Sequence, residues 1–196
     1  MKLRWILATM FTLSLGTVGT AQTNGSFEDS GCFGYSFIEP FAGSTLITGW
    51  TIGGQGVDLV CSLWEASDGS NSIDLNRVAA GSLSQDIPTV AGYTYQVAFD
   101  MSGNPDGPTI SPGHPWNSPT NKILGVNVDG SAPTLFSYDT AVEDNTRANM
   151  LWKPNVYYFA ASDATSTLTF SSMVPGAFGP ALDNVAVSMV TQVCHR

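Results

Sequence analysis

The sequence predicts an all-β protein, a two-sheet jelly-roll β-sandwich in a single domain. Helix-forming residues never cluster with a period of 3.6, whereas short runs of β-branched and aromatic residues recur between turn signals. Alternation is clearest where Tyr93, Tyr95, Val97 and Phe99 are separated by smaller or polar residues. One face of such a strand is expected to lie in the core and the other in solvent.

Eleven segments carry a strand pattern, and short strands at this spacing are typical of a two-sheet sandwich. In chain order they are 25–28, 45–52, 57–60, 72–75, 82–87, 93–101, 122–128, 134–138, 150–160, 166–172 and 181–189. The segment 103–119 holds five prolines and three glycines, so we expect an irregular loop. A loop of this length is more often functional or mobile than inert.

Residues 1–21 are expected to be a signal peptide, and residues 22–196 the sandwich domain. Lys2 and Arg4 form a positive start, an apolar run covers 5–15, and Gly19-Thr20-Ala21 fits a small-x-small cleavage site. The apolar run is shorter than the about 20 residues that a membrane helix needs, and no later segment is long and apolar enough. We therefore expect a secreted, extracellular protein without a membrane span, either released or held in the cell envelope.

The chain is acidic, with a formal net charge of −9, and removal of Lys2 and Arg4 with the leader makes it more negative. Nucleic acids and anionic lipid surfaces would repel such a protein. Neutral polysaccharides and cations are the partners that this charge permits. A need for solubility alone would explain the charge equally well.

Three cysteines allow three pairings, and export permits disulfides. We favour Cys32–Cys61, both in the N-terminal half of the chain. Closing that loop contributes about 3 to 4 kcal/mol in the chain-entropy model. Cys194 is then either free or paired with another chain.

Many short motifs follow one another in a fixed order along residues 24–190. Examples are NGSFE at 24–28, GSTLITGWTIGG at 43–54, FDMSGNPD at 99–106 and GPALDNV at 179–185. This ordered set resembles the bacterial "choice-of-anchor C" extracellular proteins, which are related to a plant cell-wall family classed as domain of unknown function 642. The resemblance implies a galactose-binding-domain-like jelly roll, as in many carbohydrate-binding modules.

Glu28 and Asp183 form the predicted metal site. The resemblance implies that they hold a structural calcium, and two carboxylates on neighbouring strands would suit such a hard cation. The turn at Asp68-Gly69-Ser70 could add further oxygens. The alternative is that both acids are solvated or accept backbone N–H bonds.

Sugar rings stack on aromatic faces, and their hydroxyls need amides and carboxylates. The ligand-binding candidates are Trp116, Trp64, Trp152, His114 and Asn117. Trp116 is the strongest, because it lies in the irregular loop beside polar side chains. Trp50, in a strand motif, is expected in the core, where most aromatic residues of β-proteins lie.

The sequence favours a non-catalytic protein that binds extracellular or cell-wall polysaccharide. It contains no Gly-x-Ser-x-Gly, His-Glu-x-x-His or Cys-x-x-Cys motif. One alternative is a matrix or envelope protein that binds another protein through a sheet face, with Cys194 linking two chains. A weaker alternative is a glycosidase that uses an acid such as Asp106.

Overall fold

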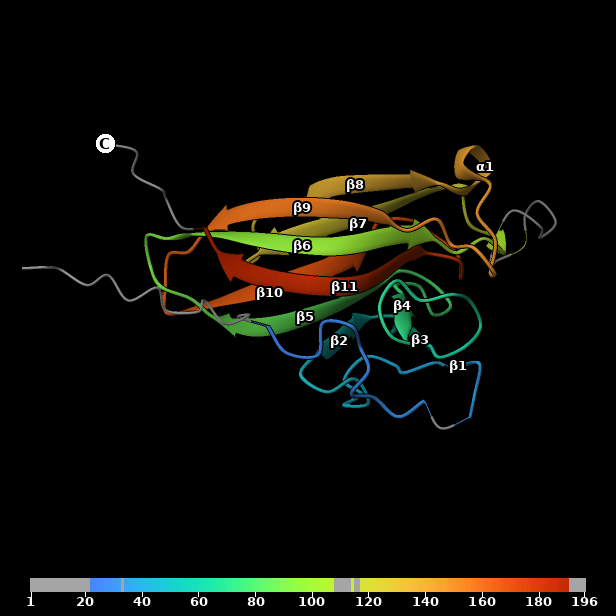
Figure 1. Ribbon diagram of the computed structural model, residues 1–196, viewed down its shortest axis with the longest axis horizontal. Coiled ribbons are helices and arrows are strands. Elements are labelled where there is room, and N and C mark those ends of the chain that lie inside the picture. Colours follow the sequence, from blue (N-terminus) through green and yellow to red (C-terminus); the bar gives the residue numbers. More distant parts are fainter. Residues whose placement is uncertain (1–21, 33, 108–113, 115–116, 191–196) are drawn as a thin grey trace, which may run out of the picture.

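The computed structural model describes residues 22–32, 34–107, 114 and 117–190. Two antiparallel sheets pack face to face (Figure 1). In spatial order, the first sheet contains β1 (Phe37–Ile38), β3 (Asp58–Val60), β4 (Ser72–Asp74), β11 (Pro180–Met189), β6 (Thr94–Gly103) and β9 (Lys153–Ala160). The second contains β2 (Thr51–Gly54), β5 (Gly81–Pro88), β10 (Thr165–Ser172), β7 (Asn121–Val128) and β8 (Thr134–Asp139). These sheets confirm the predicted all-β sandwich.

The core lies between the sheets, as the alternation predicts. Along β6, Tyr95, Val97 and Phe99 are buried, while Tyr93 just before the strand is 51% exposed. Phe99 packs edge-on against Phe170, with ring centroids 5.3 Å apart. These alternating apolar side chains pack between the two sheets and hold them face to face. The helix α1 (Thr140–Glu143) is a single turn, capped by the Asp139 side chain.

The prediction of a strand at 25–28 was wrong, although this segment does lie beside β11. Val185 donates its backbone N–H to the carbonyl of Gly25 at 2.9 Å. Asn24 and Phe27 have positive φ, and the Asn24 side chain bonds the backbone of Asp29 and Thr48. Such local bonds from an asparagine side chain compete with strand pairing, so the segment turns instead of extending.

Most other strands lie within one or two residues of the predicted bounds, and the larger differences are at β2, β9 and β1. The segment 45–52 is extended only from Thr51, because Gly49 has a φ of 82° and Trp50 donates back to Ile47 in a turn. β9 begins at Lys153 instead of 150. The two-residue edge strand β1 was not predicted, since two residues carry no readable alternation.

Cys32 and Cys61 form the predicted disulfide, with their Cα atoms 5.7 Å apart. The bond joins the segment before β1 to the residue after β3, so it holds this edge of the sheet together. Cys194 and the leader 1–21 lie outside the described residues. No helix in the described part of the chain has the length and apolar character to cross a bilayer.

Candidate functional site

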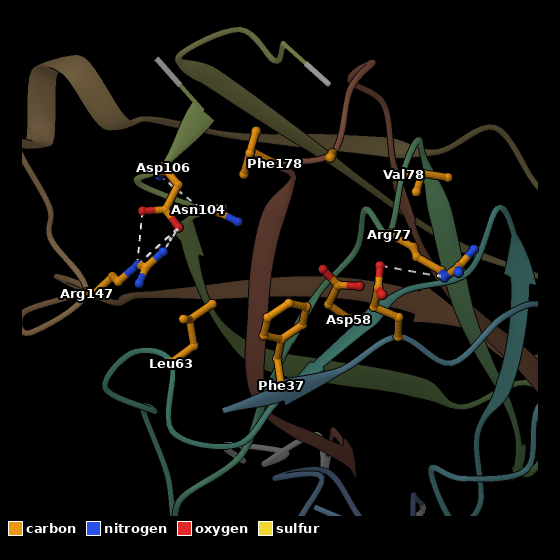
Figure 2. Close-up of a pocket in the computed structure, with 11 residues that line it drawn as sticks. Phe37, Asp58, Leu63, Arg77, Val78, Asn104, Asp106, Arg147 and Phe178 are labelled. Atoms are coloured by element: carbon orange, nitrogen blue, oxygen red, sulfur yellow. Dashed lines mark hydrogen bonds and ion pairs between the residues drawn. The ribbon is translucent and has the colours of Figure 1, made fainter. Parts of the chain in front are cut away.

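A cavity of about 250 Å³ opens at the β1 edge of the six-stranded sheet (Figure 2). Its wall combines apolar and charged side chains from segments far apart in the sequence. The lining residues are Phe37, Glu39, Asp58, Leu63, Arg77, Val78, Asn104, Asp106, Arg147, Ala177 and Phe178.

The strand register explains why these segments meet. Pro180 pairs with Gly103, and Ala181 pairs with Asp74. The loops that follow β4 and β6 and the loop that precedes β11 therefore lie at one end of the sheet. Asp58 opens β3 directly opposite Asp74, so it lies beside these loops.

A buried polar network around Asp74 lies behind the cavity wall. Asp74 is fully buried and accepts hydrogen bonds from the backbone of Asn76 and Gly179, both at 2.9 Å, and from Asn104 Nδ2 at 2.7 Å. Burial raises the pKa of Asp74 to about 7, and these three bonds oppose the rise. The network fixes the position of Asn104 in the cavity wall.

Lys122 extends this network under Phe178. Its side chain is fully buried, and Nζ donates to the carbonyl of Phe178 at 2.8 Å. Burial lowers the pKa of Lys122 to about 8, while the charges of Asp74 and Asp139 act in the opposite direction. The loop that carries Phe178 is thus held in place by a buried cation.

Asp58 is the cavity residue with the most unusual environment. Its Oδ1 is buried and has no hydrogen-bond partner among the described residues. Burial first, and then the charges of Asp74 and Glu39, raise the pKa of Asp58 to about 9. At neutral pH the side chain is therefore a neutral carboxyl group, which can both donate and accept a hydrogen bond.

Two ion pairs lie on opposite sides of the cavity (Figure 2). Arg147 binds Asp106 in a bidentate manner, with Nη2 to Oδ2 at 2.6 Å and Nε to Oδ1 at 3.0 Å. Arg77 Nε lies 4.0 Å from Glu39 Oε1. The carboxylate of Asp106, considered above for glycosidase chemistry, is thus bound to an arginine.

The predicted ligand-binding residues have different surroundings. Trp64 is only 5% exposed, donates from Nε1 to Ser72 Oγ at 2.8 Å, and packs in a small core cluster. Its ring has no free face for a sugar, so the prediction that Trp64 binds ligand was wrong. Trp152 is half-buried, and its Nε1 donates to the Glu65 carbonyl at 2.9 Å.

Trp116 lies outside the described residues. His114 is exposed, and its carbonyl accepts the Asn117 N–H at 2.9 Å. This segment continues to Ser118, whose Oγ accepts the N–H of Phe178 in the cavity wall. Leu63, the neighbour of Trp64, also lines the cavity. The loops that carry Trp64 and Asn117 therefore border the cavity, although neither residue lines it.

Among the residues that line the cavity, only Asp106 was a candidate from the sequence, and for a different chemistry. Asp58 follows Val57 and precedes Leu59 and Val60 in an apolar run. An acid within such a run is a readable signal, because an acidic side chain is rarely buried without a partner. Phe37 and Arg77 carry no comparable signal, since their position depends on the edge strand and the loop after β4.

Glu28 and Asp183 bind opposite ends of one turn. Glu28 Oε1 accepts the N–H groups of Ser70 and Asn71, at 2.8 and 2.7 Å. Asp183 Oδ2 accepts those of Ser67 and Asp68, at 2.7 and 3.0 Å. We call this arrangement the 67–71 clamp.

The clamp requires glycine at position 69. Gly69 has a φ of +68°, and a Cβ there would lie 2.5 Å from Glu28 Oε1. Asp183 is fully buried, and burial raises its pKa to about 7 against the opposing effect of its three backbone N–H bonds. The carboxylates thus have a structural role as acceptors for the backbone N–H groups of this turn.

Some capacity for calcium remains at the clamp. Each carboxylate oxygen has two lone pairs, and Glu28 Oε2 makes no hydrogen bond with the described residues, while Asp183 Oδ1 accepts one, from Asn184. No three His, Cys, Asp or Glu side chains within the described ranges form a metal-binding group. Backbone carbonyls and water would therefore have to supply most of the six to eight oxygens that calcium takes.

Several known proteins resemble this chain. Halomucin of Haloquadratum walsbyi is 30% identical over 183 residues, which is 88% of this chain and 2% of Halomucin. The chain thus spans a very small part of that relative.

Among solved structures, TmCBM61 in complex with beta-1,4-galactotriose aligns with a TM-score of 0.47 and 15% identity, over 88% of this chain and 99% of its own. A family 35 carbohydrate binding module from Clostridium thermocellum aligns with a TM-score of 0.49 and 13% identity, over 78% and 98%. The family described as "Protein of unknown function (DUF642)" matches residues 21–188, and the chain belongs to it.

Proposed function

We propose that this protein is a secreted, non-catalytic glycan-binding protein that recognises extracellular or cell-wall polysaccharide. The observation that carries the proposal is the cavity of Figure 2, where aromatic rings and hydrogen-bonding groups face one small space. Binding sites for small organic ligands are typically concave and apolar, with a few well-placed polar groups.

The charge of the cavity favours a neutral ligand. Its two arginines are balanced by Glu39 and Asp106, and Asp58 is protonated at neutral pH. The acidic chain as a whole disfavours nucleic acids and other polyanions. Neutral sugars, which combine C–H faces with hydroxyl groups, suit such a wall. The disulfide is consistent with an extracellular location.

The proposal includes one structural calcium at Glu28 and Asp183, as the sequence predicts. The ion would bind carboxylate oxygens of Glu28 and Asp183, the two residues that hold the 67–71 turn. It would thereby link Glu28 to β11, which carries Asp183. Its contribution would be to stability and not to chemistry. Membership of the narrower choice-of-anchor C group stays a prediction.

The test is binding of the purified, secreted protein to a broad panel of polysaccharides and oligosaccharides that includes β-1,4-galactan. We expect at least one neutral glycan to bind in a saturable manner, without turnover. If a folded sample binds none, the proposal fails. The protein-partner alternative is then the one to test, first by non-reducing electrophoresis for a dimer linked through Cys194.

A further inference from the structure

Two hydrogen-bonding atoms in the cavity wall are buried and lack a partner among the described residues. One is the acceptor Asp58 Oδ1 and the other is the donor Arg77 Nε. The 4.0 Å between Arg77 Nε and Glu39 Oε1 is too long for a hydrogen bond. Buried polar atoms are nearly always hydrogen-bonded in folded proteins. The other polar atoms of these two side chains, Asp58 Oδ2 and the Arg77 Nη nitrogens, make no hydrogen bond with the described residues either, and both residues line the cavity. The wall therefore offers one carboxyl group and one guanidinium group to a ligand that both donates and accepts.

Hydroxyl groups match this requirement. Each hydroxyl can donate one hydrogen bond and accept two, so neighbouring hydroxyls of one ring can bond both a carboxyl group and a guanidinium group. A cation would not suit Asp58, because its pKa of about 9 leaves the side chain neutral at pH 7. An anion would not suit the site either, because both arginines already face carboxylates.

The size of the cavity limits the ligand to about one ring. Its 250 Å³ lies below the about 300 to 1,000 Å³ that is typical of pockets for drug-sized ligands. The ion pairs Arg147–Asp106 and Arg77–Glu39 lie on either side, with Phe37 and Asp58 between them (Figure 2). A polysaccharide passing straight through would have to cross both ion pairs, whereas a chain end need not.

We propose that the cavity binds the terminal residue of a neutral polysaccharide, with ring hydroxyls bonded to Asp58 and Arg77 and a C–H face against Phe37. Phe37 is 38% exposed at the cavity, so part of its ring is available. This inference rests on the proposed glycan binding and names the part of the glycan that is recognised.

A length series tests recognition of a chain end. The glycan found by the panel is compared as its methyl monosaccharide and as oligosaccharides of increasing length, by calorimetry on the intact protein. We expect the monosaccharide to bind and the affinity per chain end to change by less than about twofold with length. An affinity that rises steadily with length would show binding along the chain and would overturn the inference.

Variants test the residues. Asp58→Ala and Arg77→Met each remove one hydrogen-bonding group, and Phe37→Ala removes the ring. We expect each to weaken binding by about tenfold or more, the equivalent of about 1.4 kcal/mol. Asp58→Asn should restore most of the affinity lost in Asp58→Ala, because a neutral amide, like the protonated carboxyl group, both donates and accepts.

The matched control is Tyr158→Ala. Tyr158 is an aromatic residue, 56% exposed, on β9 at the opposite edge of the same sheet. We expect this variant to bind as the wild type does, and melting curves confirm that each variant is folded. If the wild type binds glycan and the three cavity variants bind equally well, the cavity is not the site, although glycan binding itself stands. If no glycan binds the wild type, the proposed function fails first.

Discussion

Asp183 and Asp58 lie on the same sheet and differ in what surrounds them. Both have a pKa raised mainly by burial. Asp183 accepts three backbone N–H bonds, from Ser67, Asp68 and Asn184. The buried Oδ1 of Asp58 has no hydrogen-bond partner among the described residues, and Asp58 lines the cavity.

The two acids differ in how far hydrogen bonds offset the effect of burial. Asp183 is completely buried, yet its pKa rises only to about 7, whereas that of Asp58 rises to about 9. Hydrogen bonds to the charged form offset desolvation at Asp183, and nothing does so at Asp58 except the charge of Arg77. Burial alone therefore does not determine how far the pKa of an acid rises in this sheet, because hydrogen bonds to the charged form oppose the rise.

The largest expected effect is on stability at Asp183. Asp183→Ala leaves three backbone N–H groups of the clamp without their acceptor, which we expect to lower the free energy of unfolding by about 3 kcal/mol. Asp58→Ala should cost less than about 1 kcal/mol, because it breaks no hydrogen bond. Urea unfolding of both variants at pH 7 measures the difference. Equal losses would mean that the two acids do not differ in this way.

A smaller effect is expected in the pH dependence of stability. Because the folded-state pKa of Asp58 is above the unfolded value of 3.8, its contribution to stability is full below pH 3.8 and is lost as the pH rises to about 9. Asp74 and Asp183 lose theirs by about pH 7. Of these three acids, only Asp58 still loses its contribution to stability between pH 7 and 9.

Asp58→Asn isolates this window. We expect the variant to be more stable than the wild type at pH 9, by on the order of 1 kcal/mol after allowance for solvent at the cavity, and about equal at pH 5. Lys122, with a pKa lowered to about 8, adds stability as the pH rises above 8, but equally in both proteins. Unfolding at pH 5, 7 and 9 checks this; parallel pH profiles would show that Asp58 does not titrate as described.

The sequence predicted the long strands better than the turns. Strand alternation at 93–101 and 166–172 correctly predicted β6 and β10, because each strand buries one face against the opposite sheet. The segment 25–28 was mispredicted because the side-chain bonds of Asn24 override its local pattern. Local composition therefore predicts long strands well and turns held by side chains poorly.

The candidate site was harder to predict, because residue type does not reveal burial. Trp64 was selected as an aromatic residue, but its ring is used in the core. Phe37 reaches the cavity from a two-residue edge strand that pairs with β3. Asp58 and Asp74 were within reach of sequence reasoning, since both are acids inside apolar strands. That Asp58 and Asp74 lie opposite each other on β3 and β4 could be known only from the strand register in the structure.

The smallest expected effect concerns calcium at the clamp. Extracellular calcium sites are often weak, with Kd values near 10⁻⁴ to 10⁻³ M, so about 1 mM calcium would add only about 0.4 to 1.4 kcal/mol. A chelator should therefore lower the melting temperature slightly. Glu28→Gln should abolish that response, yet it keeps Oε1 as the acceptor for Ser70 and Asn71, so the clamp itself is retained. An unchanged melting curve of the wild type in chelator would mean that backbone amides alone satisfy these carboxylates, as they do at Asp183 Oδ2.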